Sequence, residues 1–121
     1  MNRQRAILLS VLALLAILLA ALMLRGGRPV TVLVTLTDYQ IGTSPQVVRR
    51  GDLVTLAIRN EGRVEHELEI EGYDLEVEGI QPGETRRLTF RATRAGTFHL
   101  VCHLDDHDER GMRAEFRIDE S

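Results

Sequence analysis

Residues 96–112, GTFHLVCHLDDHDERGM, decide how this chain is expected to fold and what it can bind. In the first half, Phe98, Leu100 and Cys102 recur at every second residue, which is the period of a β-strand. The second half spaces Cys102, His107 and Met112 in a C-x4-H-x4-M run. A thiolate, an imidazole and a thioether are soft donors, so the segment predicts a strand that leads into a metal-binding loop.

A second histidine is expected to complete the donor set from a distant part of the chain. In residues 64–71, His66 shares one face with Val64, Leu68 and Ile70, and every second residue is a glutamate. Alternate side chains of a strand point to the same side, so His66 and Cys102 are both predicted to point inward and to meet. One thiolate, two imidazoles and a weak thioether are the ligands of blue-copper electron-transfer sites. The candidate metal ligands are therefore His66, Cys102, His107 and Met112.

The order of these motifs resembles the cupredoxins, the blue copper proteins, which include membrane-anchored members such as auracyanin and sulfocyanin. The matching pieces span about residues 30 to 118, and four of them in one order are specific. They are Asn60-Glu61-Gly62 before His66, the Gln81-Pro82-Gly83-Glu84 turn, Gly96-Thr97-Phe98 leading to Cys102, and His107 to Gly111-Met112.

The resemblance implies a Greek-key β-sandwich that holds one copper ion and passes single electrons between redox partners. The chain departs from the family pattern at two places. Asp105-Asp106 stands where Pro-Gly usually precedes the second histidine, and His99 and Val101 occupy positions that are often aromatic. His103, directly after the cysteine, is a possible competing ligand.

The rest of the chain after residue 30 supports an all-β fold. Apolar residues alternate in five further short segments separated by Gly, Pro and polar turns, a pattern typical of an antiparallel sandwich. These segments are residues 30–37, 54–58, 64–71, 88–90 and 114–118, and no helical pattern follows the first segment.

The first segment is predicted to be a transmembrane helix. Residues 6–24 contain no charged side chain over 19 residues, long enough to cross a hydrocarbon core. Arg3 and Arg5 precede it, which favours a cytoplasmic N-terminus and places the following domain outside. The predicted organisation is a membrane anchor at 1–25, a linker at 26–29 and a cupredoxin-like copper-binding domain at 30–121, single-pass in the cell membrane on the periplasmic side. A cleaved signal peptide is the alternative for residues 1–25.

Charge is distributed unevenly along the chain. All 18 acidic residues follow position 30, whereas four of the 15 arginines lie at or before Arg28, so the exported part carries a net charge of −7. This charge argues against a nucleic-acid partner and favours a redox protein with a basic docking surface. The stripe formed by Glu65, Glu67, Glu69 and Glu71 is a candidate for that contact, or else only the solvated face of a sheet.

These observations favour a membrane-anchored electron carrier that is not an enzyme, because one ligand set cannot build a trinuclear copper centre. A copper-delivery or storage protein is one alternative, and an accessory subunit of a respiratory oxidase is another. The binuclear copper site of such a subunit needs a second cysteine, whereas the chain has one. Each residue also has an ordinary structural interpretation: Cys102 as a buried thiol, Met112 as core, His107 as a surface residue paired with Asp106 or Asp108, and His99 and His103 as solvated side chains.

Overall fold

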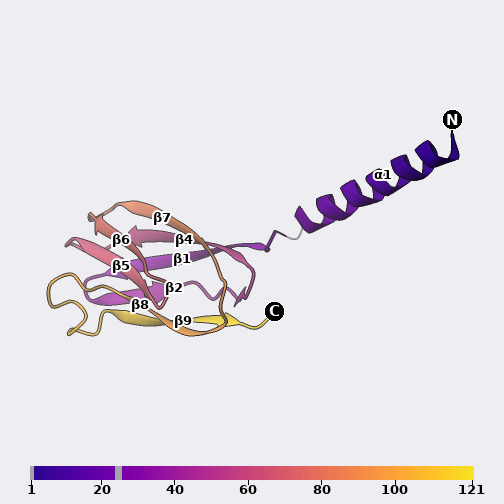
Figure 1. The fold of residues 1–121 in the computed structure, drawn as a ribbon. Coiled ribbons are helices and arrows are strands. Elements are labelled where there is room, and N and C mark those ends of the chain that lie inside the picture. Colours follow the sequence, from indigo (N-terminus) through magenta and orange to yellow (C-terminus); the bar gives the residue numbers. More distant parts are fainter. Residues whose placement is uncertain (1, 24–25) are drawn as a thin grey trace.

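A computed structural model describes residues 2–23 and 26–121 as one helix followed by nine strands (Figure 1). The helix, α1, runs from Arg3 to Met23. The strands are β1 (Pro29–Thr37), β2 (Gln40–Thr43), β3 (Val48–Arg49), β4 (Leu53–Asn60), β5 (His66–Glu71), β6 (Leu75–Ile80), β7 (Thr85–Arg91), β8 (Gly96–Val101) and β9 (Arg113–Asp119).

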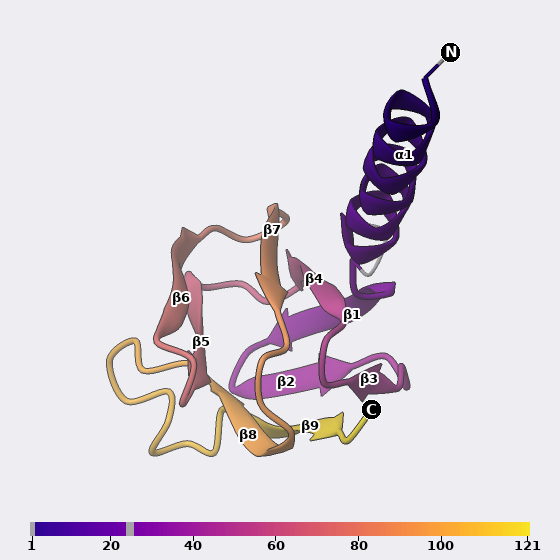
Figure 2. The same cartoon turned by 45° about the vertical axis from the view of Figure 1, so that its right-hand side comes forward.

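The strands form a two-sheet sandwich, as the sequence predicts. One sheet has the order β2-β1-β4-β7 and the other β3-β9-β8-β5-β6. Figure 2 shows β5 and β6 on the left of the sandwich, apart from β1 and β4. Most pairs are antiparallel, but β1 runs parallel to β4 and β3 runs parallel to β9. These two parallel pairs were not expected, because apolar periodicity carries no information about which strand lies beside which.

The core lies between the sheets and consists of the alternating apolar residues. Val32, Val34 and Leu36 of β1 are almost fully buried, whereas Leu33 on the other face of the strand is exposed. Burial alternates in the same way along β5, where Leu68 and Ile70 are inside. The prediction for Val64 was wrong: it lies before β5 begins and is 39% exposed, because the chain turns between Asn60 and His66.

Helix α1 lies at one end of the domain. Its residues Arg3–Leu22 are long and apolar enough to cross a membrane, and none of this stretch is buried against the domain. A signal sequence near the N-terminus has the same properties. Leu24 and Arg25, which close the predicted anchor, lie outside the described residues. Because β1 begins at the helix end and rises about 3.3 Å per residue, its nine residues carry the chain roughly 30 Å to the opposite end.

That opposite end carries the loop of residues 102–112, drawn in orange to yellow on the left of Figure 1. At the helix end, the Arg49–Leu53 turn joins the linker to the sheets. Gly51 has φ +96, a left-handed conformation that suits glycine. The carboxylate of Asp52 is buried and accepts hydrogen bonds from the Arg49 backbone N–H at 2.8 Å and from Arg28 at 3.0 Å.

This turn gives a stability prediction. The hydrogen bond from Arg28 holds the pKa of the Asp52 carboxyl below its usual value. Asp52→Asn should therefore lower the free energy of unfolding at pH 7 by about 1–2 kcal/mol, because a charged acceptor contributes more than a neutral one. The stabilisation by the carboxylate is present above the unfolded-state pKa of about 3.9 and is lost as pH falls through the lower folded-state pKa, so the difference should narrow in acid.

Denaturant unfolding at several pH values, followed by circular dichroism, measures the difference. Glu120→Gln is the matched control, because Arg50 and Glu120 are also 3.0 Å apart but both are exposed. Exposed pairs contribute about 0.2–1 kcal/mol at most. Equal effects of the two substitutions, or a difference that does not change with pH, would contradict the role given to Asp52.

Candidate metal centre

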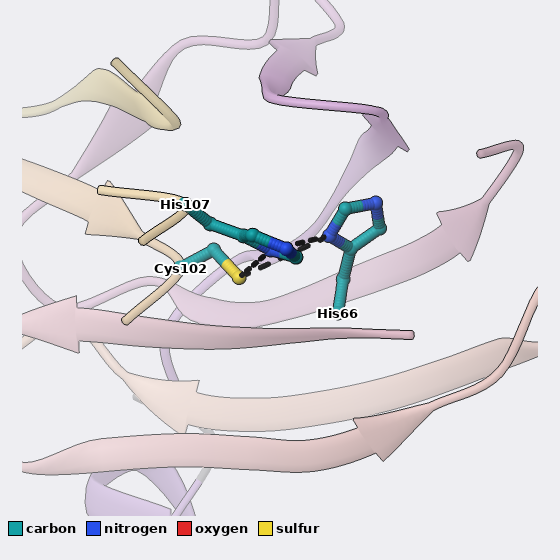
Figure 3. Close-up of side chains that lie close together, drawn as sticks. All are labelled: His66, Cys102 and His107. Atoms are coloured by element: carbon teal, nitrogen blue, oxygen red, sulfur yellow. Dashed lines mark hydrogen bonds between the residues drawn. The ribbon is translucent and has the colours of Figure 1, made fainter. Parts of the chain in front are cut away.

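Three of the four predicted ligands converge at the end of the sandwich opposite α1 (Figure 3). His66 is the first residue of β5, Cys102 follows β8, and His107 lies in the loop after it. The Nδ1 atoms of the two histidines are 3.2 Å apart, and Cys102 Sγ lies 3.9 Å from His66 Nδ1 and 3.4 Å from His107 Nδ1. His66 and Cys102 are fully buried, and His107 is 6% exposed. Figure 3 shows the thiol and both imidazoles pointing toward one another.

The spacing of these donors fits one metal ion. First-row metals bind nitrogen at about 2.0 Å and thiolate sulfur at about 2.3 Å in protein sites. Three such donors at trigonal angles lie about 3.5 Å (N to N) and about 3.7 Å (N to S) apart, by the same bond lengths. The observed separations of 3.2–3.9 Å bracket these values. Two imidazoles and a thiolate are the equatorial donors typical of blue-copper sites.

Met112, the fourth predicted ligand, is fully buried beside this group. Its backbone closes the loop at both ends: the Met112 N–H donates to the His107 carbonyl at 3.0 Å, and the Cys102 N–H donates to the Met112 carbonyl at 3.1 Å. Gly111, with φ +87, makes the turn into Met112. The residue is therefore held at the site, and its role as a weak axial ligand stays a prediction.

The loop closes without the usual Pro-Gly turn. Asp105 takes a left-handed conformation, φ 50, which aspartate tolerates better than most residues. The His107 N–H then donates to the Leu104 carbonyl at 3.0 Å, and Asp106 forms an ion pair with Arg110 at 2.9 Å. The loop is thus shaped by a left-handed aspartate and a surface ion pair at the place where the resemblance implied Pro-Gly. His107 is only 6% exposed, so its interpretation as a surface residue is wrong. The two aspartates named for that pairing lie elsewhere: Asp106 pairs with Arg110, and Asp108 lies 3.5 Å from His103.

The protonation states at the site suit a soft metal ion. Burial raises the pKa of the Cys102 thiol, so metal binding must displace its proton. Burial and the neighbouring His107 lower the pKa of His66. The imidazole therefore stays neutral and keeps a nitrogen lone pair that can bind a metal ion. The Glu67 backbone N–H lies 3.5 Å from Cys102 Sγ, where it can stabilise a thiolate.

The two other histidines lie outside this donor group. His99 is on the outer face of β8, 3.8 Å from Glu71, as its position in the strand predicts. His103 is half-exposed, and its ring nitrogens lie 3.2 Å from a carboxylate oxygen of Glu69, 3.8 Å from one of Glu71 and 3.5 Å from one of Asp108. A role of His103 as a competing ligand therefore has no support in this geometry.

The glutamate stripe of β5 is more involved with the site than the sequence suggested. Glu67 accepts a hydrogen bond from the His103 backbone N–H at 3.0 Å, and burial raises the pKa of its carboxyl. Glu71 pairs with Arg113 at 2.8 Å. On the adjoining strand β6, Glu76 and Glu78 are exposed and take part in no ion pair among the described residues. Within these two strands, the exposed glutamates are therefore those of β6.

Sequence reasoning missed three residues around the ligands. Asn60 is fully buried and joins the turn before His66 to the rest of the sheet, donating to the Val64 and Ile80 carbonyls at 2.8 Å each.

Tyr39 packs edge-on against the His107 ring, with centroids 5.2 Å apart, and Arg110 lies over Tyr39. The carboxylate of Asp38 lies 3.6 Å from His66 Nε2. Asn60 was noted only as part of a turn, and Asp38 and Tyr39 sit in a turn without any ligand motif.

Comparison with solved structures shows the same fold. Reduced auracyanin from Roseiflexus castenholzii is 17% identical, with a TM-score of 0.65 over 76% of this chain and 98% of that one. Auracyanin A from Chloroflexus aurantiacus, described as a "blue" copper protein, is 19% identical, with a TM-score of 0.63 over 75% and 99%. A copper-containing nitrite reductase from Thermus scotoductus is 24% identical, with a TM-score of 0.55 over 78% of this chain but 28% of the enzyme. No curated protein sequence matches.

A family model described as a cupredoxin-like domain matches residues 7–112. The match covers most of the chain and includes all three converging donors, as well as Met112. With a cupredoxin sandwich and a buried His-Cys-His group at its end, the chain belongs to the cupredoxin-like domain family.

Proposed function

We propose that the protein is a mononuclear blue copper protein that carries single electrons. His66, Cys102 and His107 would hold the ion, with Met112 as the axial donor, and the copper would supply the Cu(II)/Cu(I) couple. The observation that carries this proposal is the convergence of one thiol and two imidazole nitrogens, 3.2–3.9 Å apart, in a buried site. The solved auracyanin described as a "blue" copper protein shares the fold.

The protein surroundings suit electron transfer more than substrate chemistry. All three donors come from segments fixed by backbone hydrogen bonds. His66 pairs with Ile80 in the sheet, and the backbones of Cys102 and His107 are each hydrogen-bonded to the backbone of Met112. Rigid donors change little between the two copper oxidation states, which favours fast transfer. Burial of His66 and Cys102 excludes water, and Tyr39 covers the His107 ring, so little room is left for a substrate.

Three other functions have less support. Copper delivery needs a site that a partner can reach, whereas two of the donors here are fully buried. The nitrite reductase that shares the fold is much longer, since the chain spans 28% of it, so its activity does not carry over on the fold alone. An oxidase subunit with a binuclear copper site would need a second cysteine, and the sequence has one.

The copper assignment is tested by an absorption spectrum of the full chain with one equivalent of Cu(II). The wild type should show an intense visible thiolate-to-copper band, and Cys102→Ser should abolish it, because serine offers no thiolate. His103→Ala is the matched control: it removes the neighbouring imidazole, which lies outside the donor group, and should leave the band unchanged. A band that survives in Cys102→Ser, or is missing from the wild type, would refute the blue-copper assignment.

We further propose that α1 stays attached as a membrane anchor, with residues 1–25 as the anchor, 26–29 as a linker and 30–121 outside the cytoplasm. The length and apolar character of Arg3–Leu22 support this, as does the position of Arg3 and Arg5 before the apolar run. Because β1 leads away from the helix, the metal centre would lie roughly 30 Å from the membrane end of the domain, open to partners.

Mass spectrometry of protein extracted from membranes tests the anchor. The uncut chain should appear at 13.6 kDa and should need detergent for extraction, since an apolar helix of this length partitions into lipid. An alkaline wash that leaves the protein in the membrane fraction would control for peripheral binding. A mature N-terminus between Ala20 and Gly27 would refute retention of the anchor while leaving export intact.

The partner is proposed to be a redox protein with a basic docking surface and not a nucleic acid. Two observations support this: the net charge of −7 after residue 30, and the acidic strands β5 and β6. In their sheet β5 lies next to β8, the strand that leads to Cys102, and β6 lies on the other side of β5. Acidic surfaces accelerate encounter with basic partners through long-range attraction.

The partner proposal predicts that electron transfer to a cationic protein slows as salt rises, because the Debye length falls to about 10 Å at 0.1 M ionic strength. Replacing both Glu76 and Glu78 with Gln should slow the reaction roughly threefold or more at low salt, through association. These residues are preferred to Glu67, whose backbone N–H lies beside the thiol. Stopped-flow rates across a salt series measure the effect, with Glu120→Gln, at the helix end, as the control. Rates that respond to neither salt nor substitution would leave β6 a solvated sheet face.

A further inference from the structure

The ring edge of His66 that faces away from the candidate metal centre carries an unpaired nitrogen. His66 Nδ1 points toward His107 and Cys102, so Nε2 lies on the opposite side of the ring (Figure 3). This Nε2 is completely buried and makes no hydrogen bond within the described part of the chain. A buried N–H without an acceptor costs about 1–3 kcal/mol, so its surroundings call for a physical explanation.

The nearest ionisable group to this nitrogen is the carboxylate of Asp38, at the turn between β1 and β2. Asp38 Oδ1 lies 3.6 Å from His66 Nε2, which is beyond hydrogen-bond range by about 0.4 Å. The carboxylate is held in place by Arg63, whose backbone N–H donates to Oδ1 at 2.8 Å and whose Nε donates to Oδ2 at 3.2 Å. The backbone hydrogen bond from Arg63 lowers the pKa of the Asp38 carboxyl, so the group is ionised at neutral pH.

Gly62 makes the approach of these two groups possible. A Cβ atom at position 62 would overlap Asp38 Oδ1 more closely than real Cβ contacts allow, and it would lie 3.0 Å from His66 Nε2, which is unusually tight. The Gly62 N–H is in turn held by Asn60 Oδ1 at 2.8 Å. Space, and not backbone freedom, is therefore the reason for glycine here, since any side chain would separate the carboxylate from the imidazole.

From this arrangement we infer that Asp38 is a positioning residue: its carboxylate attracts the Nε2–H of His66, which leaves Nδ1 unprotonated and facing the position that a bound copper ion would occupy. The inference rests on the proposed function. Partners of this kind fix the tautomer and orientation of a ligand histidine and raise its basicity. A carboxylate at this place also stabilises the higher charge of Cu(II) relative to Cu(I), so it lowers the reduction potential. Asp38 does not touch the metal and undergoes no reaction; it acts through His66.

The metal-free protein gives the first test, in which no copper is needed. His66 should carry its proton on Nε2, and His107 should carry its proton on Nδ1 and donate it to His66 Nδ1, 3.2 Å away. Long-range ¹⁵N NMR of the full chain in detergent reads both tautomers directly. In Asp38→Ala the preference at His66 should weaken to a mixture. A His66 that carries its proton on Nδ1 in the wild type would overturn the inference, whether or not copper binds.

The copper-loaded protein gives the second test, through the reduction potential. Asp38→Asn keeps the shape and one acceptor oxygen but removes the charge, and it should reduce the ratio of Cu(II) to Cu(I) affinity about tenfold, which for one electron is about 59 mV upward in potential. Glu61→Gln is the matched control, because it removes the same charge from the turn between β4 and β5 that contains Gly62, and Glu61 pairs with Arg59 and not with His66. It should change the ratio less than about threefold, since exposed charges act through water.

A second variant guards against loss of folding in Asp38→Asn. Gly62→Ala leaves the carboxylate in the chain but pushes it away from His66, so it should raise the potential in the same direction while Asp38 remains charged. Equal potentials in Asp38→Asn, Gly62→Ala and Glu61→Gln would overturn the role of Asp38. A wild type that binds copper without a thiolate band would instead refute the proposed function, and the NMR tautomers would still decide the contact between Asp38 and His66.

Discussion

The register between β5 and β8 is the constraint on which the metal centre depends. Glu69 pairs with Val101 in the antiparallel ladder, which brings the start of β5 beside the residues that follow β8. Because side chains alternate, a slip of one residue would turn His66 outward and bury the glutamates in its place. Burying an unpaired carboxylate is so unfavourable that the apolar pattern of Leu68, Ile70 and Leu100 selects one register. The same packing that builds the core therefore sets His66 opposite Cys102.

The sequence predicted the elements in which period-two burial is strong and missed those in which it is weak. β1, β4 and β5 were expected because their apolar residues alternate over several positions and become buried. β2 and β3 are four and two residues long, too short to show a period. β6 alternates apolar and acidic residues, but its apolar side chains are mostly only half-buried, and Gly79 interrupts the pattern. The parallel pairing of β1 with β4 depends on topology, which periodicity does not encode.

The sequence predicted the candidate metal donors but not the residues that surround them. The donors could be found because metal chemistry restricts residue types, and a single loop carries three of the four candidates at fixed spacings. The contacts around them could not. Asp38 meets His66, and Tyr39 meets His107, across segments distant in sequence, and aspartate and tyrosine in a turn suggest nothing about a ligand. Val64 was misplaced for a related reason, because the side chain of Asn60 bonds to its carbonyl and holds it in the turn outside the strand.

Two electrostatic effects of this site act in opposite directions on the relative stability of Cu(II) and Cu(I). A Cu(II) ion with one thiolate and neutral imidazoles carries a net charge of +1, whereas the Cu(I) form is neutral, so burial of Cys102 and His66 by itself favours the reduced state. Negative charge nearby favours the oxidised state, and it declines with distance and with exposure to water. Most glutamates of β5 and β6 are on the outer face, where solvent weakens them. Asp38 is different, since its side chain is 21% exposed and lies 3.6 Å from His66, a candidate ligand. At the proposed copper site, the balance between these two effects would therefore depend more on the one carboxylate beside His66 than on the larger acidic surface.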